Sequence, residues 1–124
     1  MYRKHAVGAR GEDLACSFLI RQGVKIRNRN FRVRGGEIDI IAIDGAELIF
    51  VEVKARSSAH YGFPEEAVTR TKLLRICRAI KAYLTSRSTP SSVAYRFDII
   101  AIDRADGAQP LIRHIKQCEL PDFF

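Results

Sequence analysis

Apolar residues recur with helical spacing in two segments of the chain. Over residues 9–22 they fall on one helix face, and Gly23 is a natural C-terminal stop. The residues of that face are Leu14, Ala15, Phe18 and Leu19. A second apolar stripe predicts a helix that starts at about Glu66 or Thr69 and ends at Leu84. Its residues are Leu73, Ile76, Cys77, Ile80 and Leu84.

Five shorter runs, rich in β-branched residues, predict strands. They cover residues 25–33, 37–43, 48–54, about 93–102 and about 111–117. Gly35-Gly36 separates the first two runs, and Asp44-Gly45 is a strong hairpin signal between the second and the third. The order α-β-β-β-α-β-β predicts an α/β fold with a mixed sheet flanked by helices. With 124 residues, the chain is expected to form a single domain.

Charged residues interrupt the apolar pattern of the two central runs. Because side chains alternate between the faces of a strand, Glu37 and Asp39 are expected on one face, and the isoleucine after each of them on the other. By the same rule Glu52 and Lys54 share a face of the next run. The length of the hairpin loop decides how these two pairs meet.

Two registers of the hairpin bring the charged pairs together. A two-residue loop at the Asp-Gly signal would place Glu37 opposite Glu52. A four-residue loop, 44–47, would place Asp39 opposite Glu52 and Glu37 opposite Lys54. Both registers leave the four polar groups on one face of one ribbon, whereas a three-residue loop without a bulge would separate them.

The composition adds a strong positive charge. The formal net charge is +7, and 15 of the 21 basic residues are arginine, which suits bidentate phosphate contacts. Residues 1–34 carry a net charge of +7, residues 35–64 carry −3, and residues 65–90 carry +4. This layout is expected if carboxylates hold a cation inside a phosphate-binding surface. It would also arise if the acids only offset local repulsion.

Several protein classes do not fit this sequence. Its longest apolar runs are too short to cross a bilayer, and no apolar core follows the basic residues at the N-terminus. The three cysteines, Cys16, Cys77 and Cys118, form no Cys-x-x-Cys pair, which argues against a disulfide scaffold and a zinc ribbon. We therefore expect no membrane contact and a reducing, cytoplasmic location.

Carboxylates that face each other across a hairpin are destabilising unless a cation or a proton neutralises them. Oxygen ligands without an accompanying His or Cys point to a hard cation, Mg²⁺ or Mn²⁺. A lone Glu-Val-Lys is more often an ordinary half-exposed strand, and a Glu37–Lys54 pair across the strands is a further structural alternative. Glu12 lies at the edge of the apolar face of the first helix, where either a role at the site or a helix-capping role would explain it.

Several short motifs then follow one another along the chain. They are Gly11-Glu12, Arg29-Asn30, Gly36-Glu37-Ile38-Asp39, Phe50-Val51-Glu52-Val53-Lys54-x-Arg56 and Arg96-Phe97-Asp98. Over residues from about 8 to 102 they resemble the YraN-like family of small bacterial proteins. That family is similar to archaeal Holliday-junction resolvases and to the PD-(D/E)xK, restriction-endonuclease-like folds. Ile38 replaces the proline that gives the motif its name, and the family itself carries Gly-Glu-Ile-Asp there.

The resemblance implies a role for each charged group. Asp39 and Glu52 would bind one or two Mg²⁺ (or Mn²⁺) ions, assisted by a main-chain carbonyl near Val53 and by Glu12. Lys54 would orient the attacking water or stabilise charge on phosphorus, and Glu37 would be either a further ligand or a partner that holds Lys54. The residues expected to contact phosphates are Arg10, Arg32, Arg34, Arg56 and Lys72.

These implications lead to a metal-dependent endonuclease that acts on DNA, with branched or flapped DNA as a candidate substrate. The alternatives are a non-catalytic nucleic-acid-binding module and a structural, partner-binding subunit. By analogy with the resolvases, a homodimer is expected. Asp98 would either extend the acidic site or form an arrangement with Arg96 that serves a neighbouring strand or a dimer contact. His60, Tyr61 and Phe63 are weaker candidates for substrate contact on the 55–64 loop.

Overall fold

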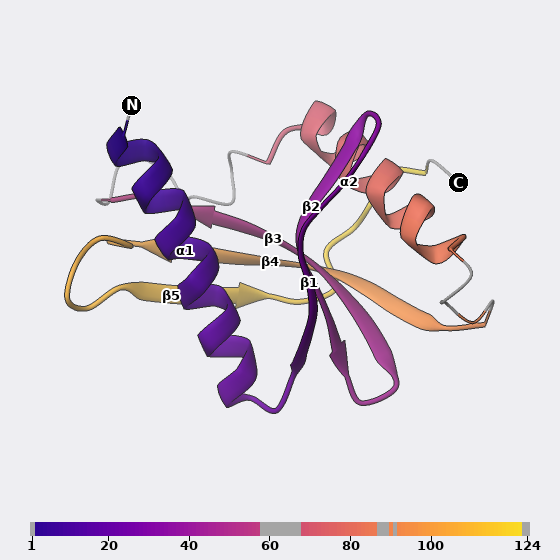
Figure 1. Cartoon of the computed structure of the whole chain (residues 1–124), viewed down its shortest axis with the longest axis horizontal. Helices are drawn as coiled ribbons and strands as arrows, with labels where there is room; N and C mark the ends of the chain where they lie inside the picture. The colour runs from indigo at the N-terminus through magenta and orange to yellow at the C-terminus, as the bar shows by residue number, and fades with distance from the viewer. Residues whose placement is uncertain (1, 58–67, 87–89, 91, 123–124) are drawn as a thin grey trace.

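The computed structural model describes residues 2–57, 68–86, 90 and 92–122, with side chains from residue 8 onward. Helix α1 (Tyr2–Arg21) comes first, followed by strands β1 (Lys25–Val33), β2 (Gly36–Asp44) and β3 (Glu47–Ala55). Helix α2 (Arg70–Leu84) precedes strands β4 (Ala94–Asp103) and β5 (Leu111–Ile115). This order confirms the predicted one (Figure 1). The loop residues His60, Tyr61 and Phe63 lie outside the described residues.

The strands form one five-stranded sheet in the order β1-β2-β3-β4-β5. Neighbouring strands are antiparallel except β3 and β4, which are parallel because the chain between them crosses over through α2. The predicted α/β fold with a mixed sheet is therefore confirmed. Among the described residues, no helix is both long and apolar enough to cross a bilayer.

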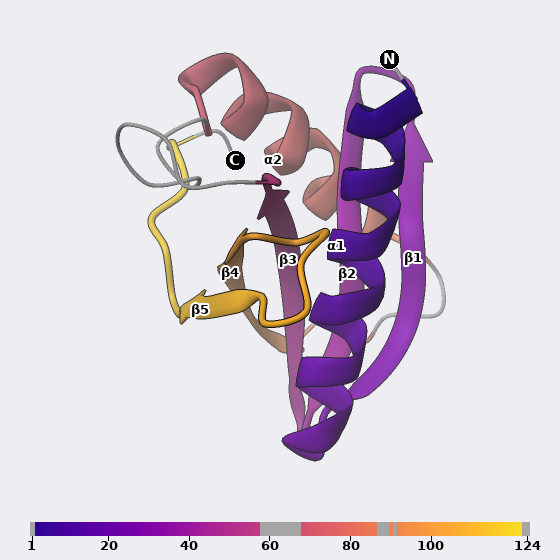
Figure 2. The same cartoon turned by 90° about the vertical axis from the view of Figure 1, so that its left-hand side faces the viewer.

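Two hydrophobic clusters fix the helices on opposite faces of the sheet (Figure 2). On the α1 face, Ala15 and Leu19 pack with Val51 and Ile100. On the α2 face, the main buried residues are Ile41, Phe50, Ile76, Ile80, Tyr83 and Phe97. Because β3 is covered on both sides, five consecutive residues in its middle are buried. A charged group on β3 can therefore reach solvent only near the end of the strand.

The helix boundaries differ from the prediction at one end. α1 begins at Tyr2 rather than at residue 9. Residues 2–8 contain no proline, so nothing in this segment stops the helix from extending toward the N-terminus. The second helix begins at the predicted Thr69 boundary, where the Thr69 side chain caps it by accepting a hydrogen bond from the backbone amide of Lys72.

The β2–β3 hairpin adopts the register that the four-residue loop predicted. Asp44 pairs with Glu47, so the loop itself is Gly45-Ala46 and the ladder extends one pair further than expected. Gly45 has a φ of +63°, a conformation that favours glycine in such tight turns. The register from a two-residue loop at Asp44-Gly45 is wrong.

The ladder between β2 and β3 stops at the pair Ile40–Val51. Beyond this pair, the Asp39 carboxylate, through Oδ2, accepts a hydrogen bond from the backbone amide of Val53 at 2.8 Å. The two strands then diverge, as Figure 1 shows. Ile38 packs on the α2 face while Ile40 packs on the α1 face, so the prediction that these isoleucines share a face is wrong. The change of face therefore falls at Asp39, where the Val53 amide bonds to a side chain instead of continuing the backbone ladder.

Candidate active site

Asp39 lies where β2 separates from β3. Its Oδ2 is fixed by the Val53 amide, which leaves the carboxylate beside the end of β3. Continuing the hairpin register places Asp39 next to Glu52, as the sequence predicted. The negative charge of Asp39 is one of the causes that raise the pKa of Glu52.

Glu52 is the most deeply buried charged group of this region, with 1% of its surface exposed. Its Oε1 has no hydrogen-bond partner among the described residues, while Oε2 lies 3.6 Å from Lys72 Nζ and 3.7 Å from Lys54 Nζ. Burial, and then the neighbouring Asp39 charge, raise the pKa of Glu52 to about 8, although both lysines act against the shift. Without a metal ion, burial beside Asp39 therefore favours the protonated form of Glu52.

Two lysines thus approach the same carboxylate oxygen from different elements. Lys54 follows Glu52 on the same face of β3, whereas Lys72 comes from the first turn of α2. Burial lowers the pKa of Lys72, but the nearby carboxylates of Glu52, Glu37 and Asp39 raise it by more than burial lowers it. The pKa of Lys72 is therefore raised overall. The sequence predicts Lys72 as a phosphate contact, and the structure places its ammonium among the carboxylates of Glu37, Asp39 and Glu52.

Glu37 completes this arrangement from β2. Its Oε1 accepts a hydrogen bond from Lys72 Nζ at 3.1 Å, and Arg32 Nε lies 3.7 Å from its Oε2. The hydrogen bond from Lys72 lowers the pKa of Glu37, which keeps this carboxylate charged. In the described part of the chain its ion pairs are with Lys72 and Arg32, so the suggestion that it holds Lys54 receives no support.

Glu12 reaches the same region from α1. The helix lies close to β3 here, since a Cβ added at Gly11 would be 2.5 Å from the Cβ of Ala55. Burial and the Asp39 charge raise the pKa of Glu12, whereas a hydrogen bond with Asn30 and the nearby Arg29 oppose the shift. The structure therefore places Glu12 within electrostatic reach of Asp39, near the end of β3.

Asn30 is a contact that the sequence reasoning did not assign. Its φ is +54°, in the left-handed region that Asn tolerates better than most residues. It lies between Arg29 and Phe31, whose partners on β2 are Ile40 and Ile38, so it stands across from Asp39. The Arg29-Asn30 motif was visible in the sequence, and an Asn within a predicted strand was the available signal.

The donor set fits a magnesium ion better than a transition metal. It consists of carboxylate oxygens, and Mg²⁺ is commonly held by one or two carboxylates together with water and substrate phosphate. The buried, unpartnered Oε1 of Glu52 beside Asp39 is the atom that such a cation would satisfy. Within the described residues, no group of three or more His, Cys, Asp or Glu side chains forms a complete cage. Asp39 and Glu52 are therefore a pair of carboxylates that could hold a cation together with water and substrate oxygens.

The five predicted phosphate contacts lie in three places, one of which is that of Lys72 beside Glu37 and Glu52. Arg10 donates from Nε to the carbonyl oxygen of Ala105 at 2.6 Å, and Arg56 forms an ion pair with Asp103, so both contact the β4–β5 connection or its border. Arg32 and Arg34 are exposed on the β1–β2 hairpin. The structure thus does not bring all five predicted residues to one surface.

The β1–β2 hairpin packs tightly on α2. A Cβ added at Gly36 would lie 2.8 Å from both the Ala79 nitrogen and the Arg75 oxygen. Arg78 Nη1 also donates to the carbonyl oxygen of Gly35 at 3.2 Å. This packing brings together a set of arginines that we call the hairpin–α2 patch, namely Arg32, Arg34, Arg75 and Arg78.

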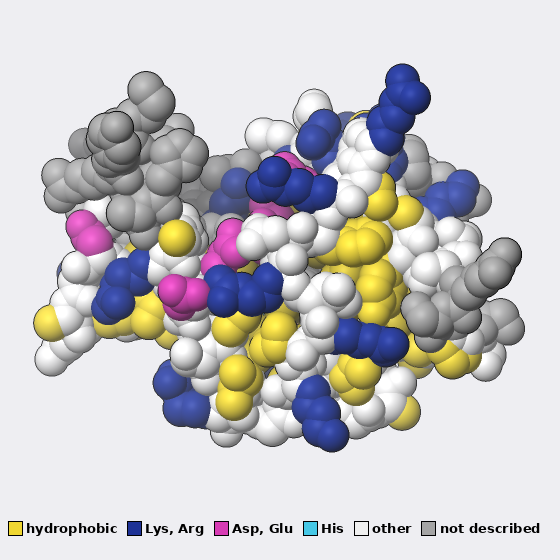
Figure 3. Space-filling view, viewed as in Figure 1, with side chains coloured by type: hydrophobic (Ala, Val, Ile, Leu, Met, Phe, Trp, Pro, Cys, Tyr) yellow, Lys and Arg dark blue, Asp and Glu magenta, His cyan; other side chains and the backbone are white. Residues whose placement is uncertain are grey.

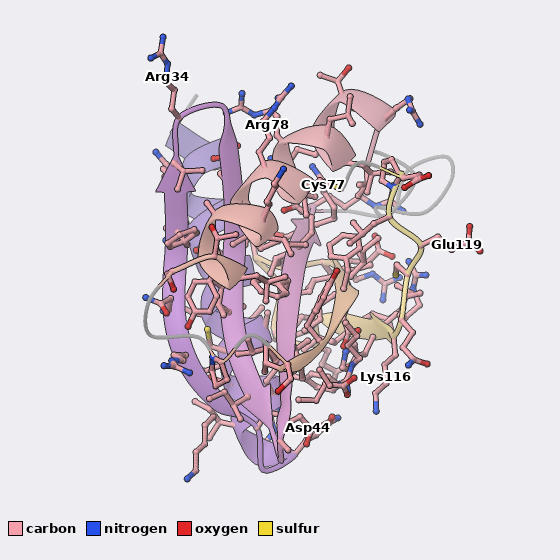
Figure 4. All side chains as sticks on the ribbon, turned by 90° about the vertical axis from the view of Figure 1, so that its right-hand side faces the viewer. Arg34, Asp44, Cys77, Arg78, Lys116 and Glu119 are labelled. Atoms are coloured by element: carbon pink, nitrogen blue, oxygen red, sulfur yellow. The ribbon has the colours of Figure 1, made fainter. Side chains whose placement is uncertain are left out.

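Two views show this patch. Arg34 extends outward from the tip of the hairpin, and Arg78 of α2 reaches the backbone of the same turn (Figure 4). In the space-filling view, Lys and Arg side chains gather along the upper edge, over the hairpin and α2 (Figure 3). Since Glu37 pairs with both Arg32 and Lys72, the patch continues into the carboxylate cluster.

Asp98 takes part in a separate, structural network. It is fully buried, and it accepts hydrogen bonds from Arg96 Nε at 3.1 Å and from the Gln117 amide at 3.0 Å. His114 Nε2 lies 2.7 Å from its Oδ2. Arg96 extends from Asp98 to Glu47 on the hairpin at 2.7 Å. The alternative in which Arg96 and Asp98 serve neighbouring strands is therefore the one that the structure adopts.

The raised pKa of Glu52 has a consequence for stability in the metal-free protein. Between the ordinary pKa of 4.5 and about 8, the folded state holds a proton that the unfolded state has lost. The free energy of unfolding is therefore expected to fall as pH rises through this interval. The raised pKa of Glu12 likewise makes the free energy of unfolding fall as pH rises. The lowered pKa values of Glu37 and Asp98 add stability that is lost only as the solution becomes acidic.

Urea unfolding at pH 5, 6, 7, 8 and 9, in the presence of a chelator, would measure this dependence. Glu52→Gln should flatten it, because the amide has no proton to lose. Glu119→Gln, an exposed site, is the matched control and should leave the pH dependence unchanged. An equally steep decline in Glu52→Gln would contradict the assignment of the effect to this carboxyl group.

Comparisons with known proteins place the chain in a family. Residues 11–102 match the model described as "Uncharacterised protein family UPF0102". A UPF0102 protein of Geobacter sulfurreducens is 50% identical over 109 residues, which cover 88% of this chain and 84% of that protein. A UPF0102 protein of Chlorobium phaeobacteroides is 48% identical over 112 residues, covering 90% and 88%.

A further relative has a similar identity and coverage. A UPF0102 protein of Rhodococcus opacus is 46% identical over 111 residues, which cover 90% of this chain and 93% of that protein. The matched range of the family model contains Glu12, Glu37, Asp39, Glu52 and Lys54. The chain therefore belongs to the UPF0102 family, the YraN-like family that its motifs resemble.

Proposed function

We propose that this protein is a metal-dependent endonuclease that hydrolyses DNA phosphodiester bonds, with branched or flapped DNA as its substrate. The observation that carries the proposal is the pairing of Asp39 with a buried, incompletely bonded Glu52 next to Lys54. The resemblance to resolvases of the restriction-endonuclease-like superfamily assigns the same three positions. The net charge of +7 suits a polyanionic substrate.

Asp39 and Glu52 are the residues that would hold Mg²⁺ or Mn²⁺. A divalent cation supplies Lewis-acid polarisation of the phosphate and lowers the pKa of the attacking water. The protein's own contribution is to keep the two carboxylates in place. Asp39 is oriented by the Val53 amide, and Glu52 is anchored in the middle layer of the sheet.

Lys54 would act on the reacting groups themselves. In hydrolysis the oxygen of a water molecule bonds to phosphorus as one bridging P–O bond breaks, and a proton from that water ends on the departing oxygen. The ammonium of Lys54 lies 3.7 Å from Glu52 Oε2 and is about one-quarter exposed, so it is available to a bound phosphate. There it would orient the water or stabilise the negative charge that develops around phosphorus.

The hairpin–α2 patch would bind the phosphate backbone of the DNA. Arg34 and Arg78 are exposed, and the patch borders the carboxylate cluster through Arg32 and Glu37. Such contacts position a nucleic acid without reading its sequence, and they weaken steeply with salt.

A homodimer would allow two symmetric cuts at a junction. We place the reaction in the cytoplasm, because the three cysteines are unpaired thiols, as a reducing compartment maintains.

A non-catalytic nucleic-acid-binding module is the second candidate. The net charge of +7 and the basic hairpin–α2 patch would serve this function without any cleavage. In that case the hairpin–α2 patch would bind nucleic acid, and the Asp39–Glu52 pair would have a structural role only.

One experiment separates the two candidates. The wild-type protein is incubated with branched, flapped, single-stranded and linear DNA during a titration with Mg²⁺ or Mn²⁺, and binding is followed in parallel in Ca²⁺. The endonuclease predicts cleavage that requires the metal, stops with chelator, and is fastest on one branched or flapped DNA. Salt-sensitive binding without cleavage in any metal would leave the binding module. A protein that neither cleaves nor binds DNA would reject both candidates.

A further inference from the structure

We infer that Lys72 is a second active-site lysine that contacts the scissile phosphate, and that Glu37 is the residue that positions it. The inference rests on the proposed nuclease function and extends it to a helix that the strand motif does not include. The starting observation is a bridge: Lys72 Nζ lies 3.1 Å from Glu37 Oε1 and 3.6 Å from Glu52 Oε2.

The bridge is held from both sides. Lys72 is in the first turn of α2, where its backbone amide donates to Thr69 Oγ1 at 3.2 Å, and the helix is anchored by buried Ile76 and Ile80. On the other side, Glu37 is held by Arg32 at 3.7 Å. The lysine side chain, about one-quarter exposed, is therefore presented at the edge of the cluster and not at a mobile surface.

The location of Lys72 is unfavourable for the helix. The first turn of α2, which is described in full, contains no acidic residue, and a positive side chain there opposes the helix dipole. The stability of the helix therefore does not account for a lysine at this position. The interaction that does account for it is with the carboxylates of β2 and β3.

Charge balance points to a role beyond neutralising those carboxylates. Lys54 already lies 3.7 Å from the Glu52 oxygen that Lys72 approaches at 3.6 Å. A cation held by Asp39 and Glu52 would compensate these carboxylates by itself. The ammonium of Lys72 would then remain beside the reaction centre with Glu37 as its partner, where it can stabilise charge that develops on the phosphate oxygens.

The test compares Lys72→Met, Lys72→Arg and Glu37→Gln with Lys81→Met, an exposed lysine of the same helix. Single-turnover cleavage at saturating protein measures the chemical step, and affinity for uncleaved DNA in Ca²⁺ measures binding. Lys72→Met should lower the cleavage rate by about 10²-fold and change the affinity less than about threefold. Lys72→Arg should recover part of the rate, and Lys81→Met should match the wild type.

The role of Glu37 has its own readout. Glu37→Gln should lower the rate by roughly tenfold in the wild-type background and have little further effect in Lys72→Met, since it acts through the lysine. Circular dichroism and urea unfolding check that each variant folds. If Lys72→Met is unfolded, the cleavage rates of Lys72→Gln and Lys72→Arg test the inference instead.

The outcomes distinguish this inference from the proposed function. If the wild type cleaves DNA and Lys72→Met cleaves it at the same rate, the inference is overturned and the proposed nuclease function stands. A loss confined to DNA affinity would also overturn it, because Lys72 would then be a binding contact only. A wild type that cleaves no DNA would reject the nuclease itself and the role of Lys72 with it.

Discussion

Asp39→Asn is expected to reduce metal-dependent DNA cleavage by about 10³-fold or more while the protein remains folded. A divalent cation at a phosphate contributes several kcal/mol of transition-state stabilisation, and each 1.36 kcal/mol corresponds to a factor of ten. Asn has nearly the shape of Asp, and its carbonyl oxygen can still accept the hydrogen bond from the Val53 amide. The substitution therefore removes the charge and retains the contact that ends the β2–β3 ladder.

Glu52→Gln should produce a loss of similar size, and isothermal titration with Mn²⁺ should show weaker metal binding in both variants. Asp44→Asn is the matched control, because this carboxylate lies at the β2–β3 turn and contacts Arg96. Its cleavage rate should equal that of the wild type. Cleavage by folded Asp39→Asn at the wild-type rate would show that this carboxylate is not part of the reaction centre.

Gly36→Ala is expected to destabilise the fold by about 1–3 kcal/mol, the usual range for overpacking. The new Cβ would meet backbone atoms of α2 at 2.8 Å, on Ala79 and Arg75, and backbone cannot rotate away as a side chain can. Either the β1–β2 hairpin or α2 must shift. Because both carry the hairpin–α2 patch, weaker DNA binding should accompany the lower stability.

Urea unfolding measures this effect against Gly8→Ala, at a glycine of α1 whose added Cβ would meet nothing within 4 Å. That control should gain up to about 1 kcal/mol, because Ala favours a helix interior over Gly. Equal stability of Gly36→Ala and the wild type would mean that the hairpin and α2 separate easily in solution.

The elements of the fold were readable from the sequence because each carries its own local signal. The Asp44-Gly45 signal and the apolar runs on either side located the hairpin, and the four-residue register placed Asp39 beside Glu52 correctly. The face of Ile38 was not predictable in this way. Strict alternation assumes an unbroken ladder, and the hydrogen bond from Val53 to the Asp39 side chain breaks it.

The lysine from α2 shows a second limit. Lys54 belongs to the strand motif and could be assigned from its spacing. Lys72 is separated from the carboxylates by the crossover, and its basic surroundings in the sequence suggested only an exposed, phosphate-binding surface. Its contact with Glu37 depends on how closely α2 approaches the hairpin, which the packing of Gly36 determines. Tertiary packing, and not local pattern, selects this partner.

The parallel pairing of β3 with β4 has a consequence for the order in which the protein assembles. β2 and β3 are joined by a two-residue turn, so the strands that carry Asp39 and Glu52 can pair early, through local contacts. β3 can pair with β4 only after the chain from Ala55 to Ala94 has closed as a loop, which is entropically slower. Lys72 lies within that loop. On this order of events the two acids meet before their helical counter-charge arrives, and Lys54, which is carried by β3 itself, is the protein's own cation beside them during that interval.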